Sequence, residues 1–318
     1  MSIGRVVYIG FMASSRAERN SRLEVDKMKL SKLLPLLLVV LILGACGRET
    51  PVGEQPARGA TVEEGQLVER GGVYYQPGTE KLFTGTAVAY HDNGQKRKEA
   101  EYRDGKRHGR ITHWYDNGQK SSEGEYRDGR EHGKVTVWRE DGRVWAERVY
   151  LDGKKHGLWT IWDESGERAV EAEYRDDQLN GKAIWYENGR KTSEVDYREG
   201  REHGKGMSWY AGGQQEVELE YRDGRPHGRA IFWYENGRKQ MEGEARDGQA
   251  YGRATFWHEN GEKLAEGEYL DGKRSGKWTE WYDNGRKKAE IRYQDGDEAS
   301  RIEWDADGNL LNEPSVWE

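Results

Sequence analysis

The sequence predicts an all-β protein, built as an elongated single-layer antiparallel sheet, or β-solenoid, of stacked hairpins. The first observation is a unit of about 24 residues that occurs nine times over residues 85–298, as in HGRITHWYDNGQKSSEGEYRDGRE. Two glycine turns in each unit and a fixed column of aromatic residues are the second and third observations. Repetition at a fixed period is typical of stacked supersecondary units. The opening glycines of the units are Gly85, Gly109, Gly133, Gly157, Gly181, Gly204, Gly228, Gly252 and Gly276.

Composition alone favours disorder, because hydrophobic and charged residues each make up 34% of the chain and the mean hydropathy is -1.10. The 13 Trp and 18 Tyr argue against disorder, since they recur at fixed places in the unit and supply large apolar area. The net charge of -7 is small for 318 residues. Without a basic excess, nucleic acid is not expected as a partner.

Residues 1–45 are interpreted as an upstream extension followed by a secretory signal. From Met28 the chain reads MKLSKLLPLLLVVLILGAC, in which two lysines precede an apolar run over 33–43. That run is about 11 residues long, short of the roughly 20 that span a bilayer. Met28 is therefore the expected translation start. A plain signal peptide and an uncleaved anchor are the alternatives to a lipoprotein signal.

The segment Leu43-Gly44-Ala45-Cys46 resembles the lipobox of bacterial lipoproteins, and Cys46 is the only cysteine in the chain. The resemblance implies that Cys46 is the lipid-modified first residue of the mature protein. It places the protein in the bacterial cell envelope, at the outer membrane if the cell has one. A single cysteine also excludes an intramolecular disulfide. Residues 46–70, rich in Gly, Pro and Glu, are expected to form a flexible tether.

Each unit is expected to be one hairpin. Its two runs are separated by DNG, EDG, ESG, ENG or AGG, and a second turn, RDG, leads to the next hairpin. Asn-Gly between such runs favours a type I′ turn, which needs positive φ at both central residues. In the second run, small or apolar residues and tyrosine alternate with acidic residues. This alternation predicts a strand with one packed and one wet face.

An aromatic residue four positions before the hairpin glycine is expected to form the core of the ribbon, since stacking would bury it between neighbouring units. After Tyr90, this column consists of Trp114, Trp138, Trp162, Trp185, Trp209, Trp233, Trp257 and Trp281. The fifth unit lacks one residue before Gly189, which predicts a shift of pleat phase and a bulge or bend. Residues 71–83 and 299–311 are expected to be half-repeats that cap a repeat domain over 71–311, with a tail over 312–318.

The motif HG-x-x-x-x-WY-x-NG-x-K-x-x-E-x-EY-x-DG-K/R resembles the variant MORN repeat of bacteria, the type grouped with YwqK-family antitoxins of toxin-antitoxin systems. The resemblance covers residues 71–297, with departures such as Ala245 in the tyrosine column and Asp177 at a turn glycine. It implies a scaffold that contacts proteins or membranes, and for the antitoxin type it implies neutralisation of a partner protein. An exported protein does not meet a cytoplasmic toxin, so an immunity protein at the envelope is the form of this alternative that fits the signal.

The candidate binding residues are a second set of aromatic side chains, expected to form an exposed stripe: Tyr115, Tyr186, Tyr210, Tyr234 and Tyr282. A glutamate five residues after each hairpin glycine, from Glu99 to Glu290, is expected to pair with Lys or Arg on adjacent strands rather than to bind a cation. The five His-Gly histidines are expected to form turns or to pack, because a spacing of about 10 Å in a stack is too wide for a shared metal.

No catalytic motif interrupts the repeat, so no enzyme, metal or cofactor is expected. The sequence therefore predicts a non-enzymatic, membrane-anchored repeat scaffold that binds a protein partner at the bacterial envelope. An antitoxin or immunity protein and a cell-wall glycan-binding module are the two alternatives.

Overall fold

The computed structural model describes residues 59–312, which form 24 strands and one short 3-10 helix. These residues belong to one unit, Ala57–Glu318, and the other unit, Met1–Pro56, lies outside the described residues. The expected signal over 1–45, the lipidation site Cys46 and residues 313–318 therefore also lie outside them.

The elements of the described chain are short and regular. The opening segment holds β1 (Ala60–Glu63), η1 (Glu64–Gln66), β2 (Val68–Arg70) and β3 (Val73–Tyr75). The first units hold β4 (Gly85–Tyr90), β5 (Lys96–Arg103), β6 (Lys106–Trp114), β7 (Lys120–Arg127), β8 (Arg130–Trp138), β9 (Val144–Leu151), β10 (Lys154–Lys155), β11 (Gly157–Trp162) and β12 (Arg168–Arg175). The later units hold β13 (Gln178–Glu187), β14 (Arg190–Arg198), β15 (Arg201–Trp209), β16 (Gln215–Arg222), β17 (Arg225–Trp233), β18 (Lys239–Arg246), β19 (Gln249–Trp257), β20 (Lys263–Leu270), β21 (Lys273–Trp281), β22 (Lys287–Gln294), β23 (Asp297–Trp304) and β24 (Leu310–Asn312).

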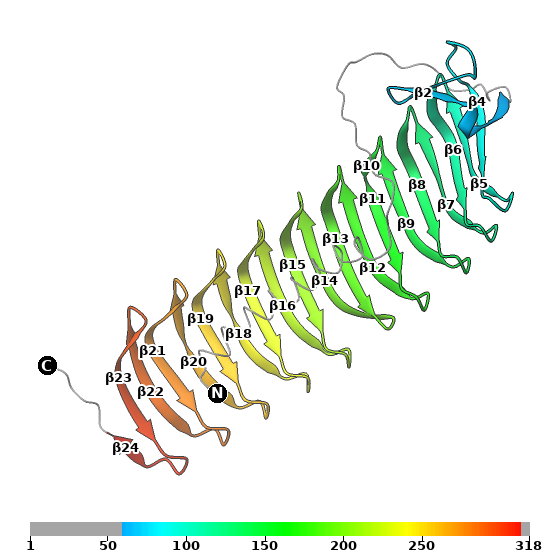
Figure 1. The fold of residues 1–318 in the computed structure, drawn as a ribbon. Coiled ribbons are helices and arrows are strands. Elements are labelled where there is room, and N and C mark those ends of the chain that lie inside the picture. Colours follow the sequence, from blue (N-terminus) through cyan, green and yellow to red (C-terminus); the bar gives the residue numbers. More distant parts are fainter. Residues whose placement is uncertain (1–58, 313–318) are drawn as a thin grey trace. The chain divides into compact units, whose positions relative to one another are not determined.

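The strands from β4 to β24 follow one another across a single sheet in chain order with antiparallel pairing, and β10 and β11 both pair with β9 (Figure 1). β1 lies parallel to β4, and β2 and β3 form a separate two-stranded sheet. The predicted architecture, a single-layer antiparallel sheet of stacked hairpins, is therefore confirmed.

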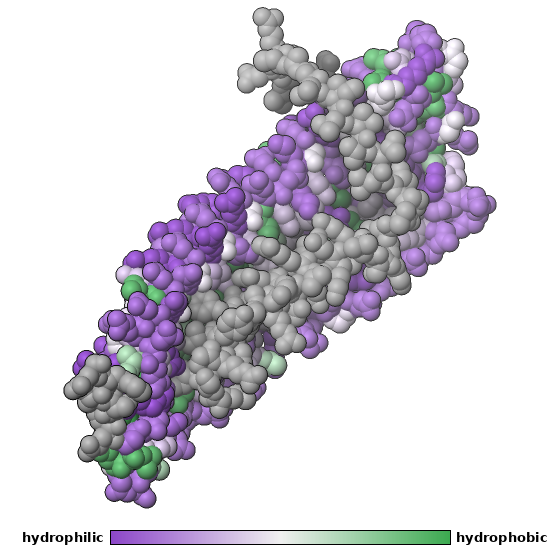
Figure 2. Space-filling view, turned by 60° about the vertical axis from the view of Figure 1, so that its left-hand side comes forward, coloured by the Kyte–Doolittle hydropathy of each residue, from purple (hydrophilic) through white to green (hydrophobic). Residues whose placement is uncertain are grey.

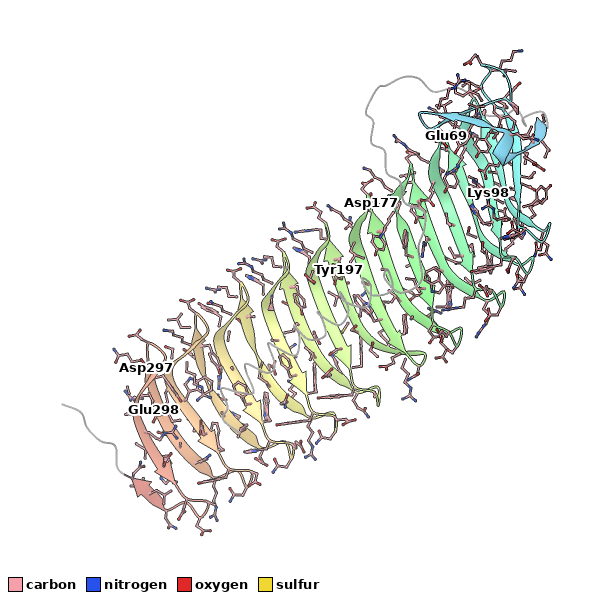
Figure 3. The ribbon with its side chains drawn as sticks, viewed as in Figure 1. Glu69, Lys98, Asp177, Tyr197, Asp297 and Glu298 are labelled. Atoms are coloured by element: carbon pink, nitrogen blue, oxygen red, sulfur yellow. The ribbon has the colours of Figure 1, made fainter. Side chains whose placement is uncertain are left out.

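Two kinds of turn alternate along the chain. Between units the turn has two residues, such as Asp104 and Gly105 with φ of 49° and 75°, the pattern of a type I′ turn. Asp177 and Asp297 mark this edge of the sheet in Figure 3. Within most units the turn is longer: the Tyr115 N–H donates to the Gln119 carbonyl at 2.8 Å, and only Gly118 has positive φ. The expected type I′ conformation is thus wrong for these Asn-Gly turns, because their extra residue allows a type I turn closed by a left-handed glycine.

The fifth unit absorbs its missing residue in the turn. Asn188 and Gly189 have φ of 50° and 71°, so this hairpin has a two-residue type I′ turn. Trp185 pairs with Val170 and Ser193, the place that Phe232 takes opposite Val217 and Met241. The strand keeps the register of the other units, so the predicted shift of pleat phase is limited to the tryptophan, which moves out of the tryptophan column. The predicted bulge does not distinguish this unit, since the register shifts at the same place in other units.

The two faces of the sheet differ in chemistry. We call the face that carries Ile111, Gly124 and Tyr126 the Tyr face, and the face that carries Trp114 and Glu123 the Trp face. The most buried side chains lie on the Tyr face, where small residues alternate with large rings: Ala100, Ala146, Ala183 and Trp278 are each 0% exposed. This alternation lets large side chains cover small ones. The hydrophobic core is therefore on the Tyr face.

The tryptophan column is not the core, which corrects the sequence prediction. Its members are partly exposed, and most lie on the Trp face under a lysine from the preceding unit. Lys120 Nζ, for example, lies 5.8 Å from the centroid of the Trp138 ring, and Lys239 Nζ lies 5.9 Å from that of Trp257. A lysine can cover a ring with its apolar stem while its ammonium group remains in water. The lysine side chains thus shield part of each tryptophan ring from water, a role that the prediction assigned to the neighbouring tryptophans.

The opening segment also differs from the expectation of a tether over 46–70 and a half-repeat over 71–83. β1 adds one strand to the edge of the sheet, parallel to β4, and the chain that follows it folds over the Tyr face of the first units instead of forming a half-repeat. Val62, Leu67 and Tyr74 pack against a buried cluster that includes Phe83 and Tyr102. These apolar side chains cover the exposed end of the core. At the other end, β23 and β24 continue the sheet.

Candidate binding surface

The expected exposed tyrosine stripe is internally bonded and half-buried, so that prediction is wrong. Four hydroxyl groups donate to the main-chain carbonyl of a tryptophan one unit further on: Tyr115 to Trp138 at 2.8 Å, Tyr210 to Trp233 at 2.8 Å, Tyr234 to Trp257 at 2.7 Å and Tyr282 to Trp304 at 2.9 Å. Burial raises the pKa of Tyr115, Tyr210 and Tyr234. Tyr186, in the shortened unit, instead donates to Glu171 at 2.6 Å. These tyrosines connect neighbouring units.

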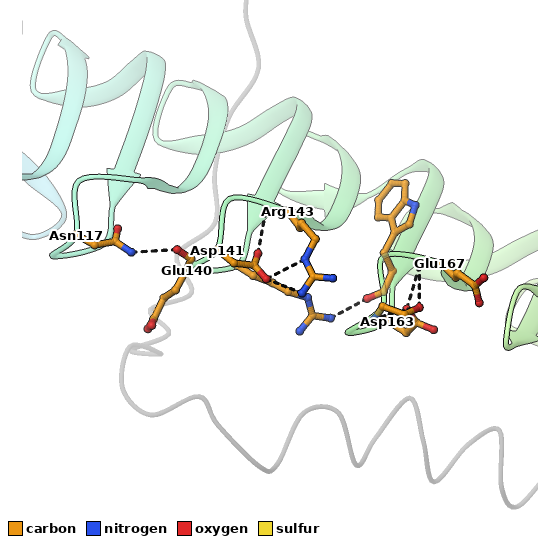
Figure 4. A network of polar contacts seen from close by, with 9 residues as sticks. Asn117, Glu140, Asp141, Arg143, Asp163 and Glu167 are labelled. Carbon is orange, nitrogen blue, oxygen red and sulfur yellow. Dashed lines mark hydrogen bonds and ion pairs between the residues drawn. The ribbon is translucent and has the colours of Figure 1, made fainter.

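The Asn-Gly turns are bonded to one another in the same way (Figure 4). The Asn117 side-chain amide donates to the Glu140 carbonyl at 3.0 Å, and its oxygen accepts the Gln119 N–H at 2.9 Å. Where asparagine and tyrosine are missing, Arg139 donates to the Trp162 carbonyl at 2.9 Å. The polar groups of this edge are therefore largely used within the stack.

The glutamates of the Trp face pair with cations, as predicted. Lys239 and Arg229 each contact the Glu242 carboxylate at 2.6 Å. The hydrogen bonds from Lys239 and then Arg229 lower the pKa of Glu242, and Lys263 and Arg253 do the same for Glu266. The acidic column is therefore neutralised by its neighbours and is not a free cation site.

The His-Gly histidines contribute to turns, again as predicted. His108 Nδ1 lies 3.3 Å from Asp128, and His132 Nδ1 lies 3.2 Å from Asp152, each aspartate belonging to the next type I′ turn. Within residues 59–312, no group of three or more His, Cys, Asp and Glu side chains is placed to hold a metal ion.

The Tyr face carries the residues that differ from unit to unit. The position two residues before each repeat glycine lies opposite the tyrosine column, as in the pairs Tyr126–Glu131 and Tyr221–Pro226. From the second unit on, its occupants are Arg107, Glu131, Lys155, Leu179, Glu202, Pro226, Ala250 and Arg274. In a repeat protein, the residues that differ between units are the ones that can distinguish one part of the surface from another. This row therefore makes the Tyr face the candidate binding surface.

Arg148 is the residue of the Tyr face that departs most from the repeat pattern. It takes a position that holds Ala100, Gly124 and Ala172 in other units, and it pairs with Val135. Its guanidinium carbon lies 5.3 Å from the centroid of the Trp159 ring, and its buried Nε has no hydrogen-bond partner. A buried donor without a partner costs about 1–3 kcal/mol, so Arg148 is an energetically costly residue at this position.

Trp159 stands beside Arg148 in an aromatic row. Its ring centroid lies 5.2 Å from that of Tyr150 and 5.1 Å from that of Tyr174, and Lys155 Nζ lies 4.8 Å above it. The adjacent Glu131 is half-buried, and burial raises the pKa of its carboxyl group. Rings and cations placed together suit recognition of carboxylates and planar groups rather than bond-breaking chemistry.

A second row repeats this arrangement near the end of the sheet. Trp278 lies 5.1 Å from Tyr269 between ring centroids, and the Arg274 guanidinium lies 4.2 Å above it. Glu280 approaches Arg274 to 3.7 Å. Sequence reasoning missed both rows, although a column-by-column alignment of the units contains the signal: tryptophan appears at 159 and 278 where other units have Ala, Gly, Val or Ile.

Most of the surface that Figure 2 colours by hydropathy is hydrophilic, with small apolar areas between. Within the described residues, no helix has the length and apolarity to cross a lipid bilayer.

The family model described as MORN repeat variant matches residues 83–104, 107–128, 155–176 and 274–295. Each match spans one hairpin, with both of its strands and the longer turn between them, as in β4 and β5 or β21 and β22. No curated protein matches the chain.

Two crystal structures align with part of the sheet. That of TcdB2-TccC3 aligns over 69% of this chain and 14% of its own, with 12% identity and a TM-score of 0.20. That of TcdB2-TccC3-Cdc42 aligns over 73% and 15%, with 12% identity and a TM-score of 0.18. This chain thus spans about one seventh of the length of those chains.

Proposed function

We propose that this MORN-repeat protein is a non-enzymatic scaffold, anchored to the membrane by an N-terminal lipid, that binds a protein partner at the bacterial envelope. The anchor is inferred from the lipobox-like segment ending at Cys46. The likeness of the repeat to the YwqK type makes an immunity protein or antitoxin one form of this function.

The observation that supports this proposal best is that the protein's own opening segment packs on its Tyr face. In the opening segment, Val62 and Leu67 pack on the buried cluster of the first units. Glu64, which lies between them in sequence, forms an ion pair with Lys98 and accepts a 3.4 Å hydrogen bond from the Tyr102 hydroxyl. A polypeptide that offers apolar side chains and a carboxylate is therefore the kind of ligand that this face accommodates.

The Trp face and the turn edge have fewer polar groups that are free to bind a partner. On the Trp face, lysines are shared between glutamates and tryptophans, as Lys239 is between Glu242 and Trp257. At the turn edge, the asparagine and tyrosine groups bond to the next unit. A partner on either surface would have to replace bonds already formed, which reduces its net gain.

We place the main contact at Arg148 and Trp159. The Arg148 guanidinium group, whose buried Nε has no hydrogen-bond partner, would donate to a carboxylate of the partner, as the Lys98 ammonium group donates to Glu64. Trp159 is only 8% exposed, so the apolar area that a partner would cover here comes mainly from the partly exposed Tyr150 and Tyr174, whose rings pack against it.

The test is affinity purification of the full chain from detergent-solubilised envelopes after mild crosslinking, with mass spectrometry of what accompanies it. Arg148→Ala is compared with Arg110→Ala, which removes an exposed arginine of the Trp face. We expect one dominant protein with the unchanged chain and with Arg110→Ala, and a clear loss with Arg148→Ala. Equal recovery with both variants would contradict the assigned surface. Murein fragments without a protein would instead favour the glycan-binding alternative.

A further inference from the structure

We propose that Asn188 is a site of spontaneous deamidation, and that the fold protects the other Asn-Gly turns from this reaction. In deamidation, the backbone nitrogen of the following residue attacks the asparagine side-chain carbonyl carbon. A C–N bond forms, ammonia leaves, and the resulting succinimide is opened by water to aspartate or isoaspartate. The reaction needs a free side-chain amide and a free backbone nitrogen, and it makes asparagine one of the thermolabile residues.

The side-chain amides of the other Asn-Gly turns are held at both ends. The Asn236 amide nitrogen donates to the Glu259 carbonyl at 2.9 Å, and its oxygen accepts the Arg238 N–H at 2.9 Å. Asn93, Asn117, Asn260 and Asn284 make the same two bonds. Rotation of the side chain toward the backbone breaks both bonds.

The attacking nitrogen is engaged in those turns as well. Gly237 donates its N–H to the Tyr234 carbonyl at 2.9 Å, and Gly118 donates to Tyr115 at 3.0 Å. These bonds are part of the type I turn itself. Attack in these units therefore requires the local turn to open first.

Asn188 lacks all three restraints. It lies in the two-residue type I′ turn of the shortened unit, is exposed, and its side chain makes no hydrogen bond within the described residues. The neighbouring Gly189 N–H also has no backbone acceptor there. Contact with the next unit is made by Arg190, which donates to the Ala211 carbonyl at 3.1 Å. Asn180-Gly181 differs again, because it lies inside β13 with Gly181 paired to Tyr197.

The cause is the missing residue of the fifth unit. The segment from Gly181 to Gly189 reads GKAIWYENG, whereas the segment from Gly228 to Gly237 reads GRAIFWYENG. Loss of the residue before tryptophan keeps the strand register and shortens the turn. Deamidation would place a further negative charge beside Glu187. In its isoaspartate form it would also lengthen the backbone of a turn whose two-residue length matches the strands.

The test is peptide mapping by mass spectrometry of the full purified chain after prolonged incubation at mildly alkaline pH. The rates at the seven Asn-Gly sites are compared with those of the same chain unfolded in urea. In the folded chain we expect Asn188 to deamidate about tenfold or more faster than the other six sites, as breaking even one or two hydrogen bonds before attack implies. In urea the seven rates should converge.

A matched variant tests the cause. Insertion of one phenylalanine between Ile184 and Trp185 restores the pattern of Gly228–Gly237, and we expect it to slow deamidation of Asn188 to the level of the other turns. The proposal is overturned if Asn188 reacts no faster than Asn236 in the folded chain. It is also overturned if the insertion folds, by its circular dichroism, yet leaves the Asn188 rate unchanged.

Discussion

Gly267 lies directly against the ring of Trp278: a Cβ atom added to Gly267 would be 2.2 Å from Cδ2 of the tryptophan. Trp278 is 0% exposed and is the largest fully buried side chain in the described residues. The pair shows how one sheet layer builds a core, because a missing side chain on one strand makes room for a large ring on the next.

Gly267→Ala should therefore destabilise the protein by about 1–3 kcal/mol, the usual cost of overpacking a filled core. The measurement is urea unfolding followed by tryptophan fluorescence. Gly243→Ala is the matched control, because its Cβ would meet that of Ala254 at 3.3 Å and needs only a small adjustment. If both variants unfold at the same urea concentration, the assigned packing is wrong.

The turn asparagines should differ in how well they tolerate aspartate. Asn236→Asp removes the donor to the Glu259 carbonyl and places two acceptors together, so we expect a loss of about 0.5–1.5 kcal/mol in unfolding free energy. Asn188→Asp removes no bond and should change stability by less than about 0.5 kcal/mol. Thermal and urea unfolding of the two variants side by side provide the comparison, and equal losses would argue against the turn ladder.

His113 should make the fold sensitive to mild acid. Burial, with Lys98 and Arg107 nearby, lowers the pKa of His113 from 6.5 to about 4. Between these pH values the unfolded chain binds a proton at His113 and the folded chain does not. The free energy of unfolding therefore decreases as the pH falls from 6.5 toward 4. Val137 occupies the same position in the next unit, so His113→Val should flatten this part of the stability profile. Urea midpoints at pH 7, 6 and 5 measure the effect, and parallel profiles for both proteins would disprove it.

Glu131 should lower the free energy of unfolding at neutral pH. Because burial raises the pKa of its carboxyl group above 4.5, folding disfavours the ionised form, and stability falls as the pH rises above that value. Glu131→Gln keeps an acceptor for the Tyr126 hydroxyl and should raise the unfolding midpoint at pH 7. Below pH 4 the gain should disappear. Glu125→Gln on β7 is the exposed control, and a similar gain there would point to net charge instead.

The sequence was sufficient to predict the repeated hairpins, because period, turn glycines and alternation all indicate the same fold. It was insufficient to assign the core. Trp114 and Tyr126 are both large and periodic, and only the strand pairing shows that they lie on opposite faces. The stripe that includes Tyr115 was predicted as exposed because a bond to a main-chain carbonyl 23 residues away leaves no trace in the residue pattern.

The site was hidden for a related reason. A search for features shared by the units finds the positions that hold the same residue type in each. Arg148 and Trp159 were selected for the site because they differ from the residues at the same positions of other units. The type I′ prediction was wrong at Asn117 and right at Asn188 because the length of the loop, more than its Asn-Gly pair, decides the turn.

The central claim, that a partner protein lies on the Tyr face of the middle units, is tested most directly by site-specific photocrosslinking in cells. One photoreactive residue replaces Leu179, opposite Tyr174 on the Tyr face, and a second chain carries it at Lys134 on the Trp face. We predict one crosslinked protein from position 179 and none from position 134. Crosslinks from position 134 alone, or none from position 179, would contradict the account.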